Sequence, residues 1–154
     1  MLESMMKRIG RVRGALERSG PWRLLVVDDD EELVRIVRRA ASVFATDLAV
    51  DVALTAEEAR ALLARERYDV VLLDQVLDGT NRGVDLLGAM PRRQPGAVVA
   101  MMSSMGRPGL VELTRRHGTM PLLPKPITAT ALRHVLHEAL DPTGRYPGHV
   151  APLR

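Results

Sequence analysis

The sequence predicts an α/β protein built on a doubly wound parallel sheet of five strands. Three observations support this prediction. Short apolar runs end in polar residues, segments with helical periodicity separate these runs, and one further strand pattern alternates apolar with polar side chains. The apolar runs span residues 24–27, 70–73, 98–102 and 120–124. Such runs are typical of parallel strands that are buried on both faces, which helical crossovers connect.

The first half of the chain predicts two strands and two helices. A strand over 23–28 is followed by a helix over 30–44, with an apolar face formed by Leu33, Ile36, Val37 and Ala40. Residues 48–52 alternate apolar with polar side chains, which predicts an edge strand with one exposed face. Thr55 and Glu58 form a capping box that begins a second helix, ending near residue 66.

The second half continues the alternation of strands and helices. The remaining strands are predicted at 69–74, 97–102 and 119–123, and the remaining helices at 83–90, at 107–116 and from Thr128 or Thr130 to Leu140. Because the second strand has the pattern of an edge, the first strand is expected inside the sheet. The strand order 2-1-3-4-5 of flavodoxin-like (βα)5 proteins fits this arrangement.

The chain divides into three predicted parts. Residues 1–22 form an arm with an extra helix, because apolar side chains recur at helical spacing over 2–18. Residues 23–140 form the α/β domain. Residues 141–154 contain three prolines and are expected to be an unstructured tail. The apolar stripe of the arm is large enough that we expect it to pack, with a homodimer as the preferred arrangement.

Composition excludes several classes of protein. The chain has 154 residues and no cysteine, which excludes disulfides and thiolate zinc sites and suits a reducing cytoplasm. No apolar run approaches the roughly 18 residues of a transmembrane helix. The net charge is +3, but residues 1–23 alone carry six basic and two acidic side chains. The rest of the chain is therefore close to neutral, and no nucleic-acid partner is expected.

Carboxylates follow two of the predicted strands. Asp28 and Asp29 come directly after the first apolar run, and Asp74 follows the run at 70–73. The carboxyl ends of parallel strands meet at one edge of a sheet, where ligands bind. Carboxylates that are this close repel each other unless one is protonated or a cation joins them, and Mg²⁺ is the natural cation for oxygen ligands. The alternative is helix capping, for which a single Asp suffices.

Asp74 allows two interpretations. A carboxylate beside Mg²⁺ can act as a nucleophile and form an aspartyl phosphate. It can also be a third metal ligand without a covalent role. The position of Asp74 at the end of a strand does not separate these.

Two further polar residues end apolar runs. Lys125 lies between two prolines and is the only lysine after residue 7, so we interpret it as the counter-ion of a phosphoryl group rather than as an exposed loop residue. Ser103 can donate a hydrogen bond to a phosphoryl oxygen. His134 and His137 are interpreted as a surface pair, because no third metal ligand is evident.

These residues, in this order, resemble the receiver domain of two-component response regulators. The resemblance covers residues 23–140, and the motifs that carry it are LLVVDDDEELVRIV, YDVVLLD, GVDLL, VVAMMSS and LLPKP. It implies roles for the following residues: Asp74 as phosphoacceptor, Asp28, Asp29, Asp74 and the Val76 carbonyl as Mg²⁺ ligands, and Ser103 and Lys125 as the residues that read the phosphoryl group.

The resemblance also implies partners. A sensor histidine kinase or a phosphotransfer protein would donate the phosphoryl group, and an output protein or an onward relay would receive the signal. Receivers of this kind are not enzymes in the usual sense, although they promote their own phosphorylation and dephosphorylation. Few residues follow the last predicted helix, so we expect a stand-alone receiver.

The sequence departs from the family pattern in three places. Asp78 stands where the family usually has proline, the stretch from Asp74 to Gly83 is one residue longer, and Leu122 replaces the usual aromatic residue. Two functions are alternatives to a phosphorylated receiver. One is a phosphatase of the haloacid dehalogenase type with Asp28 as nucleophile, and the other is a pseudo-receiver that acts without phosphate.

Overall fold

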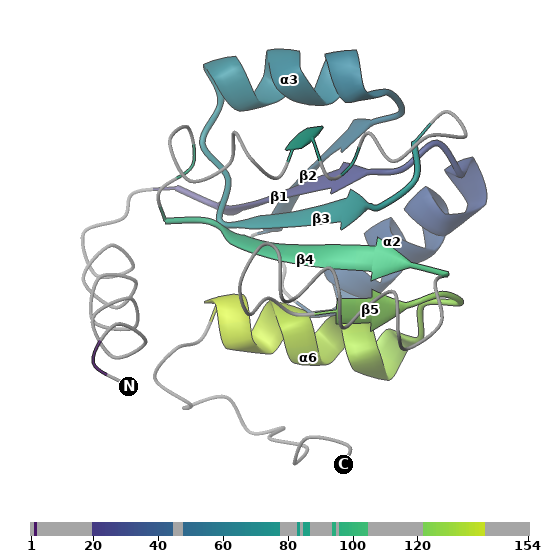
Figure 1. Cartoon of the computed structure of the whole chain (residues 1–154). Coiled ribbons are helices and arrows are strands. Elements are labelled where there is room, and N and C mark those ends of the chain that lie inside the picture. The colour runs from purple at the N-terminus through teal and green to yellow at the C-terminus, as the bar shows by residue number, and fades with distance from the viewer. Residues whose placement is uncertain are drawn as a thin grey trace.

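The computed structural model describes residues 2, 20–44, 48–77, 83, 85–86, 94, 96–104 and 122–140. Within these residues, five parallel strands form one sheet in the order β2-β1-β3-β4-β5 (Figure 1). The strands are β1 (Trp22–Val27), β2 (Leu48–Ala53), β3 (Val70–Asp74), β4 (Val98–Ser103) and β5 (Leu122–Pro124). The described helices are α2 (Glu31–Phe44), α3 (Ala56–Arg65) and α6 (Ala129–Leu140). The predicted fold class and strand order are confirmed.

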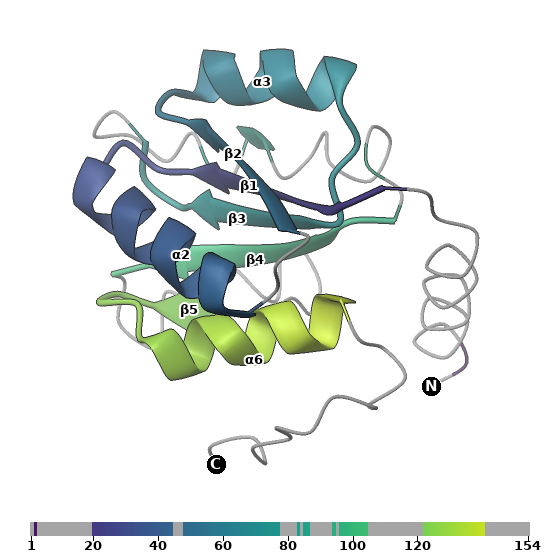
Figure 2. The ribbon, with the colours of Figure 1, turned by 180° about the vertical axis from the view of Figure 1, so that it is seen from behind.

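Helices cover both faces of the sheet. Helices α2 and α6 lie together on one face, and α3 lies on the other (Figures 1 and 2). Successive side chains of a strand point to opposite faces, so β1 supplies both cores. Leu24 and Val26 pack with α2 and α6, whereas Leu25 and Val27 pack with α3, and all four are fully buried. This double burial explains why the strands appear in the sequence as continuous apolar runs.

Short polar side chains cap the described helices. The Asp30 carboxylate accepts hydrogen bonds from two amides in the first turn of α2. The Thr55 hydroxyl accepts one from the Glu58 amide at 3.2 Å, as the capping box predicts. Thr128 rather than Thr130 caps α6. Since Asp30 supplies the cap of α2, the two preceding aspartates are not needed for that purpose.

The predicted buried face of α2 is partly wrong. Ile36 was expected on the buried face, but 46% of it is exposed. Val34 and Ala41 lie in the core instead, together with Leu33 and Val37. The buried stripe of α2 must face both the sheet and α6, and this direction differs slightly from the one that the apolar spacing alone suggests.

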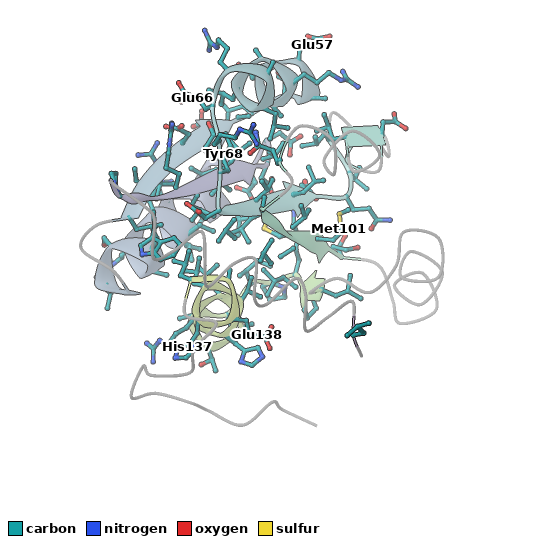
Figure 3. The ribbon with its side chains drawn as sticks, turned by 90° about the vertical axis from the view of Figure 1, so that its left-hand side faces the viewer. Glu57, Glu66, Tyr68, Met101, His137 and Glu138 are labelled. Atoms are coloured by element: carbon teal, nitrogen blue, oxygen red, sulfur yellow. The ribbon has the colours of Figure 1, made fainter. Side chains whose placement is uncertain are left out.

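A polar network lies at the opposite edge of the sheet, where the strands begin. Arg23 forms ion pairs with Glu66 and, at 2.9 Å, with Asp51, which also accepts a hydrogen bond from the Tyr68 hydroxyl at 2.7 Å. Figure 3 views this edge, with Glu66 and Tyr68 labelled. Burial and the bond to Asp51 raise the pKa of Tyr68, which therefore stays neutral. The buried Gln94 accepts a hydrogen bond from the Tyr68 amide at 2.9 Å. These bonds stabilise the end of the sheet at which the strands begin, opposite the end at which Asp28 and Asp74 lie.

Several predicted segments lie outside the described residues. They are the arm helix over 2–18 apart from Leu2, the helix over 107–116, the tail over 141–154 and most of the helix over 83–90. Among the helices that the structure describes, none combines the length and the apolar character that crossing a bilayer requires.

Candidate functional site

Four strand ends bring polar side chains to one edge of the sheet. Asp28 lies directly after β1, Asp74 is the last residue of β3, Ser103 is the last residue of β4, and Lys125 lies directly after β5. Because all strands run in the same direction, these positions converge, which is where ligands bind in open α/β sheets.

Backbone hydrogen bonds fix these positions. The Asp28 amide donates to a carbonyl of β2 at 3.1 Å. The Gln75 amide, directly after β3, donates to a carbonyl of β4 at 2.9 Å, and the Lys125 amide donates to the Ser103 carbonyl at 2.8 Å. These bonds continue the strand pairing to the site itself, so the rigid sheet sets the spacing of the site residues. The Lys125–Pro126 peptide bond is cis.

The carboxylates and the lysine form one cluster. The Lys125 ammonium lies 2.9 Å from Oδ2 of Asp28 and 3.2 Å from Oδ1 of Asp74. Asp28 is fully buried, and only 4% of Asp74 is exposed. Asp29 is exposed, and one oxygen of each of the three carboxylates lies within 4.8 Å of one oxygen of the other two. The cluster therefore joins three acids to one base.

The electrostatics of the cluster favour a bound cation. Burial, and then the negative charge of Asp28, raise the pKa of Asp74 to about 6, although Lys125 and the Val76 amide act in the opposite direction. Burial alone would lower the pKa of Lys125, but its bonds and charge interactions with Asp28 and Asp74 outweigh this and raise it. One ammonium thus compensates the buried carboxylates only in part.

The donor set fits Mg²⁺. This ion takes oxygen ligands at about 2.1 Å, so ligand oxygens on opposite sides of it are about 4.2 Å apart, which is compatible with three carboxylates that can each offer one oxygen within 4.8 Å of the others. Among the described residues, Asp28, Asp29 and Asp74 are the only group of three or more potential ligands. His134 instead lies 3.6 Å from Glu138 on α6, in agreement with its interpretation as a surface residue. The predicted surface pair is wrong for His137, which is only partly exposed and whose Nε2 atom is buried.

Asp74 has one carboxylate oxygen available for chemistry. Lys125 and the Val76 amide, the latter at 3.3 Å, both contact Oδ1 of Asp74. Within the described part of the chain, the second oxygen, Oδ2, accepts no hydrogen bond. A carboxylate that is oriented through one oxygen can present the other as a nucleophile.

Two residues near Asp74, Gln75 and Gly83, were not among the site residues that the sequence predicted. The Ser103 hydroxyl donates a hydrogen bond to Oε1 of Gln75, and both side chains are buried. Gly83 packs against the same segment, since a Cβ atom there would lie 1.9 Å from the Asp74 carbonyl oxygen. Gln75 could have been noticed in the sequence, because it is a polar residue directly before the apolar Val76 and Leu77.

Three other residues that the sequence singled out are Val76, Leu122 and Asp78. Val76 is 39% exposed, and ligation through its carbonyl stays a prediction. Leu122 is partly buried and packs against the core on the α3 side. Asp78 lies outside the described residues.

Comparison with known proteins identifies the family. A family model described as the response regulator receiver domain matches residues 24–137. The chain belongs to this family. Response regulator receivers are parts of two-component systems, so the resemblance drawn from the sequence motifs is confirmed, and the family supports the receiver interpretation over the haloacid dehalogenase one.

Curated relatives are longer than this chain. Response regulator protein PilR of Pseudomonas aeruginosa is 32% identical over 117 residues, which cover 75% of this chain and 25% of PilR. Transcriptional regulatory protein GlrR of Escherichia coli is 30% identical over 122 residues, which cover 79% of this chain and 27% of GlrR. The chain therefore spans about a quarter of the length of these relatives.

Solved structures share the fold. A CheY-like receiver domain protein from Methanospirillum hungatei has a TM-score of 0.69 at 24% identity, covering 79% of this chain and 95% of that one. A response regulator from Burkholderia pseudomallei, solved with a phosphorylated aspartic acid, calcium ion and citrate, has a TM-score of 0.64 at 23% identity, covering 77% and 66%.

Proposed function

We propose that Asp74 accepts a phosphoryl group from a histidine kinase or phosphotransfer protein in the cytoplasm, and that the phosphorylated form signals by binding a partner or by passing the group on. The observation that carries this proposal is the state of the Asp74 carboxylate. It is almost fully buried, one oxygen is held by Lys125, and the other accepts no hydrogen bond from the described residues. Membership of the receiver family supports the same role.

The transfer requires one bond to break and one to form. The N–P bond of the donor phosphohistidine breaks, and Oδ2 of Asp74 forms an O–P bond, while the electron pair stays on the imidazole nitrogen. The phosphoryl group brings additional negative charge into a buried site. The Lys125 ammonium lies close enough to balance that charge, because it already contacts Oδ1 of Asp74. The Ser103 hydroxyl, at the end of β4, would donate a hydrogen bond to a phosphoryl oxygen.

Mg²⁺ is the cofactor that we assign to the site. Asp28, Asp29 and Asp74 would hold it, together with the Val76 carbonyl. When bound, the ion supplies positive charge that draws together the carboxylates and the phosphoryl oxygens. The grouping of three carboxylates and the raised pKa of Asp74 support this assignment.

Intact mass spectrometry after incubation with acetyl phosphate and Mg²⁺ tests the proposal. We expect wild type to gain about 80 Da, the mass of one phosphoryl group. Asp74→Asn should gain nothing, since the amide is not a nucleophile. Asp85→Asn is the matched control, because it makes the same chemical change at an exposed position and should be phosphorylated like wild type.

The same experiment separates the alternatives. A pseudo-receiver shows no mass gain in wild type with acetyl phosphate or with a phosphorylated donor protein. Continuous turnover of acetyl phosphate that survives Asp74→Asn but is lost in Asp28→Asn would support the phosphatase interpretation. Equal mass gain in wild type and Asp74→Asn would place the phosphoryl group on another residue.

A further inference from the structure

The Ser103 hydroxyl has a side-chain partner in the structure. It donates a hydrogen bond to Oε1 of Gln75, the residue that follows the proposed phosphoacceptor. Only 2% of Ser103 and 3% of Gln75 are exposed, so water does not replace this bond easily.

A serine hydroxyl has a single proton to donate. If Ser103 is to donate that proton to a phosphoryl oxygen on Asp74, the bond to Gln75 must break. The Gln75 carbonyl and the phosphoryl group are therefore competing acceptors for one proton.

The backbone of Gln75 has little freedom to follow Ser103. Its amide donates to the Met102 carbonyl of β4 at 2.9 Å. On the other side, a Cβ atom on Gly83 would lie 2.9 Å from the Gln75 carbonyl oxygen, so the two backbones are in close contact. The side chains must therefore separate when Ser103 changes its partner.

We propose that Gln75 is a positioning residue that holds the Ser103 hydroxyl in the unphosphorylated state and thereby opposes the switch to the phosphorylated state. This proposal rests on the proposed function. Gln75 does not contact the phosphoryl group and acts only through Ser103. Loss of its acceptor releases the hydroxyl and favours the state in which Ser103 binds a phosphoryl oxygen.

The test measures the affinity for beryllofluoride in the presence of Mg²⁺ by titration calorimetry. This phosphate-shaped anion needs no donor, so its affinity reports the switch and not the chemistry. Gln75→Met keeps the length of the side chain but removes the strong acceptor. We expect it to bind beryllofluoride about threefold to tenfold more tightly than wild type, the range that one neutral hydrogen bond supports. Gln75→Leu is a second variant, in case Gln75→Met does not fold.

If Gln75 acts by positioning the Ser103 hydroxyl, the effect of its substitution on beryllofluoride affinity must depend on Ser103; a purely structural effect would not. In a Ser103→Ala background, the Gln75 substitution should leave the affinity unchanged, because no hydroxyl remains to be released. In a Ser103→Thr background, which keeps a hydroxyl, the gain should return. An equal gain in the Ser103→Ala background, or no gain in any background, overturns the proposal.

The outcomes also separate this inference from the proposed function. Wild type that binds beryllofluoride and gains a phosphoryl group, with no effect of the Gln75 substitution, refutes the role of Gln75 alone. Wild type that does neither refutes the proposed function, and the role of Gln75 with it.

Discussion

Binding of Mg²⁺ should weaken steeply between about pH 7 and pH 5, because the proposed ligand Asp74 must lose its proton before it coordinates a metal. Its pKa is raised to about 6 by burial and by the charge of Asp28. About a tenth of the Asp74 side chains are then protonated at pH 7 and about nine-tenths at pH 5, so the apparent Kd should rise about tenfold. An aspartate with the ordinary pKa of 3.8 would change the Kd by only about 1.1-fold.

The same shift has a consequence for stability without metal. The folded protein binds the Asp74 proton more tightly than the unfolded chain, because the pKa rises on folding from 3.8 to about 6. Between these values the unfolded chain carries fewer protons, so the contribution of Asp74 to the free energy of unfolding falls as pH rises through this window. Two pKa units correspond to about 3 kcal/mol at most. Mg²⁺ should restore part of this loss above about pH 6.

The assay is a calorimetric titration of Mg²⁺ near pH 7, 6 and 5. Asp85→Asn should show the same pH dependence as wild type, whereas any binding that remains in Asp74→Asn should depend on pH less than about twofold. If the wild-type Kd changes by less than about twofold between pH 7 and pH 5, either the pKa of Asp74 is not raised or Asp74 does not bind the metal. No binding at any pH would refute the metal site itself.

Three further substitutions, one of them with a matched control, are informative. Lys125→Ala should leave Mg²⁺ affinity near pH 8 unchanged or improve it, because the ammonium competes with the cation for the carboxylates; weaker binding in the same titration contradicts this. Gly83→Ala should lower stability by about 1–3 kcal/mol in urea unfolding and slow the phosphorylation of Asp74, since its Cβ would collide with that backbone. Gly96→Ala, which meets nothing within 4 Å, is the matched control and should stay within about 0.5 kcal/mol of wild type. Gln94→Leu should cost about 2–4 kcal/mol, because three backbone groups lose a buried partner, yet leave the phosphorylation rate unchanged; a slower rate would show that the two edges of the sheet are coupled.

The sequence by itself determined the sheet and which polar residues lie together at its strand ends. Buried parallel strands read as continuous apolar runs, and the alternating run at 48–52 identified the edge strand. When all strands are parallel, the residues at their carboxyl ends lie on the same side of the sheet. Asp28, Asp74 and Lys125 could therefore be grouped from their positions in the sequence alone, and the structure places them within ion-pair distance.

Capping could be predicted only in part. The sequence assigned Asp28 and Asp29 to a metal site, with helix capping as the alternative, and did not say which aspartate caps α2. The structure assigns the cap to Asp30, because its carboxylate reaches the amides of the first turn of α2. Asp28 instead points to Lys125, which lies 97 residues further along the chain.

Tertiary packing alone decided the remaining features. The exposure of Ile36 depends on where α6 lies against α2, and no local pattern contains that information. The bond between Ser103 and Gln75 depends on the register of β4 against β3, in which Asp74 pairs with Met102. Periodicity shows which side chains share a face of one strand or helix, because this follows from the geometry of that element alone. The partner of such a side chain depends on how two elements distant in sequence pack, which the local pattern of neither element contains.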